Sequence, residues 1–219
     1  SASTLQCPAY FVSAGLSLVS SSASVPAYDL SVSKRSSCPP AVANGSAKPS
    51  DWWQALANAL GDEMPVANLV RRSRGLTLLA LPQSYLDMVS EDLGTLSSGQ
   101  LARVRVIVAS QTKVSPRLAG TVLRYDGRLD RVASAPRGAA AYFSQRALGH
   151  FVSMLKDDLS SADIHVHREL VATALAAVEH KEVPQRQART DAEISHWLSA
   201  ADEGSQLSVT SLLQRLRDE

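Results

Sequence analysis

Three short apolar runs stand out in the chain, and each is bounded by polar or turn-forming residues. They span residues 75–81, 103–109 and 121–125. The first is apolar on both faces, which is typical of a strand inside a parallel sheet covered by helices. An earlier apolar run from Tyr10 to Val19 is interrupted by Gly15 and predicts a further buried strand that ends in a sharp turn.

Helical periodicity lies between and after these runs. It predicts helices over residues 51–60, 85–93, 138–159 and 165–178. An apolar residue recurs at every fourth position of the third segment, at Phe143, Ala147, Phe151 and Leu155. Ser50 provides an N-cap for the first helix, and Gly61 ends it. Strands that alternate with helices predict the α/β class, with a mostly parallel sheet flanked by helices.

A polar linker separates a small tail from this domain. We therefore predict an α/β Rossmann-like domain over residues 1–180 and a tail over residues 185–219. Thr190 and Glu193 have the capping-box spacing of a helix start. Two short helices around a glycine-containing turn resemble half of a helix-turn-helix unit, so the tail is a candidate DNA-binding element.

Composition narrows the functional classes. The formal net charge of +1 excludes an overall electrostatic attraction to nucleic acid but leaves room for a local basic patch. Cys7 and Cys38 are isolated, which fits a reducing cytoplasm and predicts neither a disulfide framework nor structural zinc. No apolar run approaches the roughly 18 residues of a membrane span, and the start lacks the charged segment of a signal peptide. We expect a cytoplasmic protein with no membrane partner.

Several common kinds of site lack their motifs. The sequence contains no glycine-rich phosphate-binding motif and no nucleophile elbow, so a nucleotide cofactor and a Ser-His-Asp mechanism are disfavoured. Gln111 lies in a polar loop after the second apolar run and is a candidate binding residue. His165 and His167 are predicted to share one face of a strand-like segment, but no third ligand is nearby. We therefore predict no cofactor and no metal.

The main candidate for chemistry is the loop in which Tyr28 and Asp29 follow Pro26. Proline fixes its own φ and biases the residue before it towards extended geometry, so the loop is rigid. A carboxylate on such a loop is how α/β folds present chemistry at the carboxyl edge of a sheet. Asp29 is therefore a candidate catalytic group. The alternative is an aspartate that caps the next segment through its own side chain.

A second polar cluster follows the last predicted strand. Asp126 and Arg137 lie there, and they would approach Asp29 if all three reach the same sheet edge. The alternative is a solvated turn with surface ion pairs, which contribute little energy. Gln145 and Arg146, near the start of the long predicted helix, could hold a base edge or a phosphate. Equally, they could occupy an exposed helix face.

Three segments, taken in order, resemble a known family. They are Ser13-Ala-Gly-Leu-x-Leu-Val19, Val25-Pro-Ala-Tyr-Asp29 and Leu-Leu-Ala-Leu-Pro82-x-x-Tyr-Leu86. The order is similar to that of small bacterial Rossmann-like proteins related to peroxide-stress proteins and to proteins encoded near deazaguanine DNA-modification and tRNA-guanine transglycosylase genes. The resemblance covers roughly residues 9–150, and Ser17 stands where the pattern usually has glycine.

The resemblance extends to phage-defence DNA glycosylases that remove glucosylated hydroxymethylcytosine. It implies excision of such a base from double-stranded phage DNA, which leaves an abasic site. Breaking an N-glycosidic bond develops oxocarbenium charge that a fixed carboxylate can stabilise, and the base must first leave the stack. The resemblance implies Asp29, with Tyr28 beside it, as the core of the site and the tail as an added DNA-binding element. Together with the polar clusters above, the catalytic candidates are Asp29, Tyr28 and Asp126, and the candidate substrate contacts are Ser13, Gln111, Arg137, Gln145 and Arg146. The candidate phosphate contacts are Arg71, Arg72, Arg74, Arg215 and Arg217.

Two other functions stay open at this point. One is a non-enzymatic DNA-binding stress or defence protein that uses the same sheet edge to dock nucleic acid. The other is a hydrolase of a free nucleotide or nucleoside, which would not need the tail.

Overall fold

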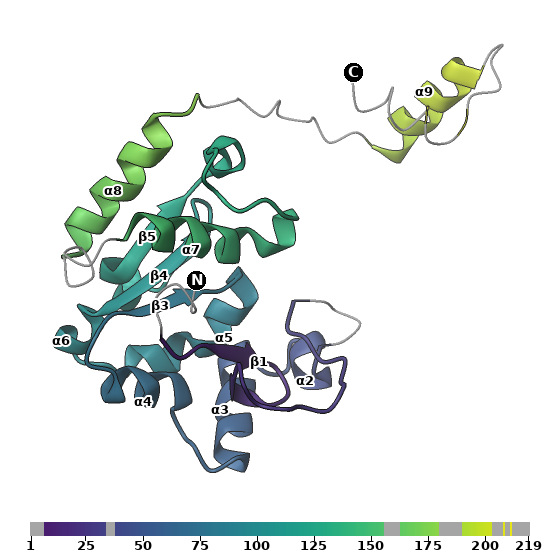
Figure 1. Ribbon diagram of the computed structural model, residues 1–219. Coiled ribbons are helices and arrows are strands. Elements are labelled where there is room, and N and C mark those ends of the chain that lie inside the picture. The colour runs from purple at the N-terminus through teal and green to yellow at the C-terminus, as the bar shows by residue number, and fades with distance from the viewer. Residues whose placement is uncertain are drawn as a thin grey trace. The chain divides into compact units, whose positions relative to one another are not determined.

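The computed structural model describes residues 7–33, 38–155, 163–179 and 190–202, together with Ser208 and Ser211 (Figure 1). Contacts between Cα atoms divide the chain into two units, residues 1–181 and residues 182–219. Each unit is described by itself below.

The larger unit is built on a three-stranded parallel sheet. Its strands β3 (Thr77–Ala80), β4 (Val104–Ala109) and β5 (Val122–Tyr125) lie in that order, and Val106 lies opposite both Leu79 and Val122. These strands are the three apolar runs of the sequence. The prediction of a parallel sheet over these residues is confirmed.

Helices cover both faces of this sheet. They are α3 (Pro49–Ala59), α4 (Pro65–Arg72), α5 (Gln83–Gly94), α7 (Phe143–Met154) and α8 (Ile164–Ala176). Successive residues of a strand point to opposite faces. Accordingly, Val106 and Val108 enter the core formed with α3, α4 and α5, whereas Ile107 enters the core formed with α7 and α8. The mixed α/β architecture with flanking helices is therefore as predicted.

Two helix boundaries differ from prediction. The cap of α3 is Lys48 rather than Ser50, because Pro49 suits the first helical position. The Ser50 hydroxyl instead donates to Glu91 at 3.0 Å. The helix expected over residues 138–159 is shorter, since α7 begins at Phe143. Its expected last residues, 156–159, lie outside the described residues.

Short elements connect the main ones. They are α2 (Pro40–Ala43), α6 (Ser98–Leu101), and the 3-10 helices η2 (Pro116–Thr121), η3 (Gly127–Arg131) and η4 (Ala140–Tyr142). Neither α6 nor the longer α4 was expected from the periodicity of the sequence.

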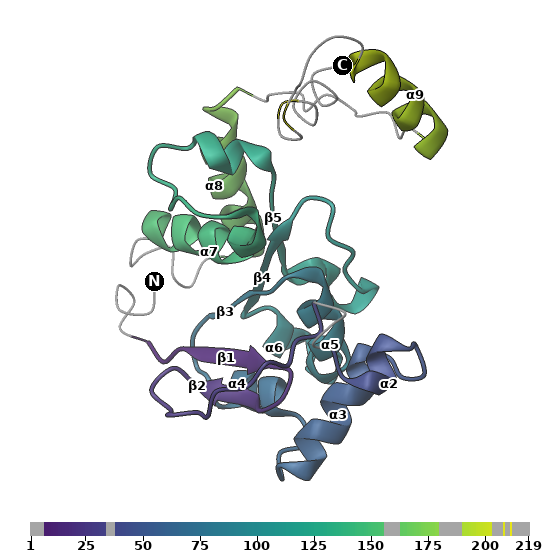
Figure 2. The same ribbon diagram turned by 90° about the vertical axis from the view of Figure 1, so that its right-hand side faces the viewer.

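The first apolar run is a hairpin and not a strand of the main sheet, which corrects the prediction. β1 (Tyr10–Ser13) pairs antiparallel with β2 (Ser17–Ser20), and Figure 2 shows the pair as a ribbon separate from β3, β4 and β5. A connection of three residues can join antiparallel strands only, because a parallel pair needs a long crossover. Ser17, the first residue of β2, has a left-handed φ of 59° at the point where the short loop joins the strand.

A buried carboxylate joins three helices. Asp92 of α5 accepts hydrogen bonds from the Val66 and Ala67 amides at 3.0 Å each and from Trp53 Nε1 at 3.1 Å. The two amides belong to the first turn of α4, so Asp92 caps that helix from a distance. Burial raises the pKa of Asp92, and its three hydrogen bonds act in the opposite direction. The sequence pattern did not reveal this network.

The smaller unit contains α9 (Asp191–Asp202). The predicted capping box is confirmed: the Thr190 amide and hydroxyl donate to Glu193 Oε2 at 2.6 and 2.8 Å, and the Glu193 amide donates back to Thr190 at 3.3 Å. Arg215 and Arg217, on the second expected tail helix, lie outside the described residues. No helix in the described part of the chain is long and apolar enough to cross a membrane.

Candidate functional site

Ser13 organises the tip of the hairpin. Its Oγ accepts the Gly15 amide at 3.2 Å and the Leu16 amide at 2.9 Å, and lies 2.6 Å from the Tyr28 hydroxyl. A serine hydroxyl has two acceptor lone pairs and one proton. Because the two amides occupy the lone pairs, this geometry favours Ser13 as the donor to Tyr28. In that arrangement the Tyr28 hydroxyl keeps its own proton for another acceptor.

Packing holds the Tyr28 ring in place. The ring lies over Gly15, where an added Cβ would be 3.5 Å from the nearest Tyr28 ring atom and 3.2 Å from Leu30 Cδ2. Trp52 supports the same turn, since its Nε1 donates to the Ala14 carbonyl at 2.8 Å. Tyr28 itself is 48% exposed. The phenol is thus fixed on one side and open to a ligand on the other.

Asp29 follows directly and is exposed. Within residues 7–33, 38–155 and 163–179, its carboxylate makes neither an ion pair nor a hydrogen bond, so it does not cap the next segment there. The carboxylate points into solvent beside Tyr28. Its acceptor capacity is therefore available to a ligand.

Two segments meet at the carboxyl end of β3. The loop that carries Asp29 reaches the start of α5, where the Ser33 and Ser84 hydroxyls are 2.7 Å apart. The first turn of α7 reaches the same place, because Ser144 Oγ donates to the Leu81 carbonyl at 3.2 Å. The loop that carries Asp29 and the first turn of α7 therefore both contact the chain just after β3.

Asp126 has the structural role that the sequence left as an alternative. It caps η3 by accepting the Arg128 amide at 3.0 Å, and it forms an ion pair with Arg128 Nη2 at 2.8 Å. Arg128 Nε donates to both carboxylate oxygens, at 3.0 and 3.1 Å. The carboxylate is already engaged, so Asp126 is a poor catalytic group.

Arg137 and Arg146 both bind Asp130. Arg146 Nη2 forms an ion pair with the Asp130 carboxylate at 2.5 Å, and Arg137 donates to the Asp130 carbonyl. Arg146 is 7% exposed and lies over the Phe143 ring. Burial makes Arg146 a brace for this segment rather than a substrate contact. Arg137 and Gln145 are exposed and stay accessible.

The other predicted contacts are dispersed. Gln111 is exposed after β4 and accepts from the Ser110 hydroxyl at 3.2 Å. Arg71, Arg72 and Arg74 are exposed, but Arg71 and Arg72 lie in the last turn of α4 and Arg74 lies between α4 and β3. They therefore lie towards the amino edge of the sheet, whereas the Asp29 loop contacts the opposite edge.

The two histidines do not share a face, which corrects the prediction. They lie on α8, where His165 is exposed and His167 is buried. His167 Nδ1 accepts from Arg105 Nε at 2.8 Å. A helix turns by about 100° per residue, so positions two apart diverge. In the described ranges, no group of three or more His, Cys, Asp or Glu residues could hold a metal ion.

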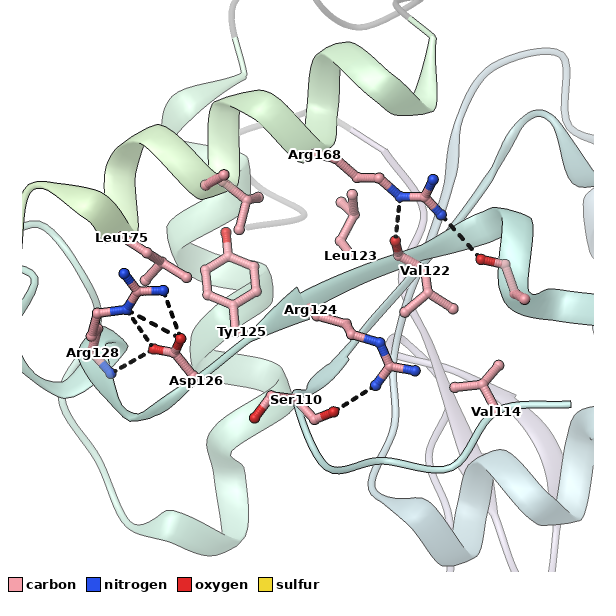
Figure 3. Close-up of a pocket in the computed structure, with 13 residues that line it drawn as sticks. Ser110, Val114, Val122, Leu123, Arg124, Tyr125, Asp126, Arg128, Arg168 and Leu175 are labelled. Carbon is pink, nitrogen blue, oxygen red and sulfur yellow. Dashed lines mark hydrogen bonds and ion pairs between the residues drawn. The ribbon is translucent and has the colours of Figure 1, made fainter. Parts of the chain in front are cut away.

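A cavity of about 530 Å³ lies between β5 and α8 (Figure 3). The sequence pattern did not indicate it. Arg124 is the signal that could have done so, because it stands in a strand whose other residues, Val122, Leu123 and Tyr125, are buried. A charged residue among the buried residues of a strand indicates that the strand lies at the edge of its sheet, where a charged side chain can reach solvent.

A comparison of the chain with protein-family models, with curated proteins and with solved structures finds no match.

Proposed function

We propose that the chain is a DNA glycosylase that excises a modified base of the glucosylated hydroxymethylcytosine type and works at the carboxyl end of β3. One observation carries the proposal: Ser13 holds the Tyr28 hydroxyl at 2.6 Å, and the next residue in the chain, Asp29, is exposed with a carboxylate that is unengaged among the described residues. A positioned donor next to a carboxylate suits the cleavage of an N-glycosidic bond.

In the proposed reaction, the bond between C1′ and the base nitrogen breaks, and its electron pair leaves with the base. The Asp29 carboxylate stabilises the positive charge that develops on the sugar and accepts a proton from the attacking water. The water oxygen bonds to C1′, and the proton passes through solvent to the departing base. Tyr28 donates a hydrogen bond to the base as it acquires negative charge.

DNA contacts would come from both sides of this site. Arg137 and Gln145 are exposed near the start of α7, whose Ser144 contacts the chain just after β3, and the loop that carries Asp29 contacts the start of α5, which follows β3. An arginine suits a phosphate, and a glutamine suits a base edge. Arg146 and Asp126 have no direct role in the proposal, because they are held by Asp130 and Arg128.

The test compares wild type with Asp29→Asn, Tyr28→Phe and the control Glu63→Gln on phage DNA that carries the modified base. Released base is measured by mass spectrometry, and abasic sites are counted with an aldehyde-reactive probe. We expect Asp29→Asn to slow release by about 10²-fold or more and Tyr28→Phe by about tenfold. Glu63 is an exposed carboxylate elsewhere, so its variant should match wild type. Release from Asp29→Asn at the wild-type rate would refute the assignment.

A second candidate is DNA binding without excision. The exposed group of Arg71, Arg72 and Arg74 favours it, because clustered arginines neutralise backbone phosphates. It is supported if wild type binds duplex DNA in a salt-dependent way but releases no base. Replacing the three arginines with glutamine should then make the binding constant less dependent on salt. The slope of log K against log salt concentration should become smaller in magnitude by about 0.9 for each phosphate that is no longer neutralised. Turnover of a free nucleoside in the same assay would instead indicate a small-molecule hydrolase.

A further inference from the structure

The cavity between β5 and α8 has no part in the reaction proposed above. β5 is the outer strand of the parallel sheet, and α8 packs along it. The cavity measures about 530 Å³, which falls within the roughly 300–1,000 Å³ of small-molecule sites. Figure 3 shows its residues arranged around β5 with α8 above.

Most of its lining is apolar. The apolar residues come from the loop before β5, from β5 and from α8: Val114, Val122, Leu123, Val171, Ala172 and Leu175. A lining of this kind favours an aliphatic or aromatic ligand body, because it removes apolar surface from water.

Two arginines provide the polar part of the cavity. Arg168 of α8 donates through Nε to the Val122 carbonyl at 3.1 Å and through Nη2 to the Ala119 carbonyl at 3.0 Å. Arg124 of β5 donates through Nη1 to the Ser110 and Thr112 carbonyls at 2.7 and 3.0 Å. These carbonyls hold the guanidinium groups in place but carry no full charge.

The positive charge of the pair is therefore not matched locally. No carboxylate of the described residues forms an ion pair with Arg124 or Arg168. Asp126 also lines the cavity, but it forms an ion pair with Arg128 at 2.8 Å. A guanidinium has five N–H donors, so each arginine retains donors for an anionic group.

An added β-strand is a poorer occupant than a small molecule. A strand would bond to the outward carbonyls of β5, but Arg168 already occupies the Val122 carbonyl. What the cavity offers to a ligand is apolar side chains and arginine side chains, not open backbone.

We propose that this cavity binds an organic anion, with its carboxylate or phosphate between Arg124 and Arg168 and its apolar body against Val114 and Ala172, which are among the more exposed apolar residues of the lining. The site is separate from the Tyr28–Asp29 site. Its test therefore does not depend on any glycosylase activity.

The probes are anilinonaphthalene sulfonate, an aromatic anion, and phenylnaphthylamine, which lacks the sulfonate. Fluorescence titration of the full chain should show one saturable site for the anion. The neutral probe should bind with an affinity that is lower by about tenfold at least. Octanoate and octyl phosphate should compete, and their ranking distinguishes a carboxylate from a phosphate ligand.

Matched variants place the probe in the cavity. Ala172→Trp fills it from α8 and should abolish binding, whereas Thr173→Trp, exposed on the same helix and not part of the lining, should not. Arg124→Met should weaken binding about tenfold, and Arg131→Met, also exposed but outside the lining, should leave it unchanged. Equal affinities for the two probes, equal binding by the two tryptophan variants, or no competition by either octyl compound would overturn the proposal.

Discussion

Replacing Ser17 with glycine should stabilise the protein. Ser17 has a φ of 59°, a region that costs an L-residue about 1–2 kcal/mol. Its hydroxyl is buried and has no hydrogen-bond partner among the described residues, which costs about 1–3 kcal/mol. Glycine removes both costs but loses about 0.5–1 kcal/mol through its greater chain entropy. We expect the free energy of unfolding to rise by about 1–4 kcal/mol.

Urea unfolding followed by circular dichroism measures this gain as a higher midpoint with an unchanged slope. In a thermal melt, each kcal/mol should raise Tm by about 2–4 °C for a chain of this size. Ser17→Ala separates the two terms, because it removes the hydroxyl and keeps the left-handed strain. Ser20→Gly, in the same hairpin but without a left-handed φ, should lower stability by about 0.5–1 kcal/mol.

Two results would refute this reasoning. If Ser17→Gly is no more stable than wild type, neither the backbone strain nor the buried hydroxyl costs what we infer. If Ser17→Ala gains as much as Ser17→Gly, the left-handed backbone carries no strain and the hydroxyl accounts for the whole effect.

Three further predictions concern the core. Asp92→Ala leaves three buried N–H donors unsatisfied and should cost about 3 kcal/mol or more in urea unfolding; a decrease under about 1 kcal/mol would contradict the capping role. Trp52→Phe removes the bond to Ala14 and should cost about 1 kcal/mol by the same assay, and unchanged stability would mean that this bond does not anchor the hairpin. Burial lowers the pKa of His150, so the unfolded chain binds its proton more readily and stability should fall as pH drops below about 6.5. Unfolding of His150→Phe should show a shallower decline between about pH 7 and 5 than wild type, and parallel curves would contradict it.

The parallel sheet was predictable because its strands carry their own signal. Residues 75–81, 103–109 and 121–125 are short apolar runs between turn residues, and burial on both faces demands that pattern. The hairpin was mistaken for a sheet strand because Tyr10–Val19 is equally apolar, although Phe11 is 63% exposed. Apolar runs do not encode which strand pairs with which.

Buried charges were not predictable for a different reason. Asp92 and Arg105 are 3% and 1% exposed, yet each occurs among polar neighbours or alternates with apolar residues like an ordinary surface charge. What distinguishes them is their partners: Trp53 for Asp92 and His167 for Arg105, the latter 62 positions away. Contacts at that separation depend on the folded topology and leave no local pattern.

The state of each hydrogen-bonding group decides which predicted site residues can act. A group whose donors or acceptors are already engaged must break those bonds before it binds a ligand, which costs about 1–3 kcal/mol for each buried partner left unsatisfied. Asp126 and Arg146 have to break existing ion pairs, because Arg128 and Asp130 hold them, although these partners are not buried. Tyr28 and Asp29 do not, since Ser13 orients the phenol without consuming its proton and the carboxylate is exposed. Residue type and spacing made both Asp29 and Asp126 candidates, with Asp29 first, and their hydrogen-bond partners separate an available carboxylate from a helix cap.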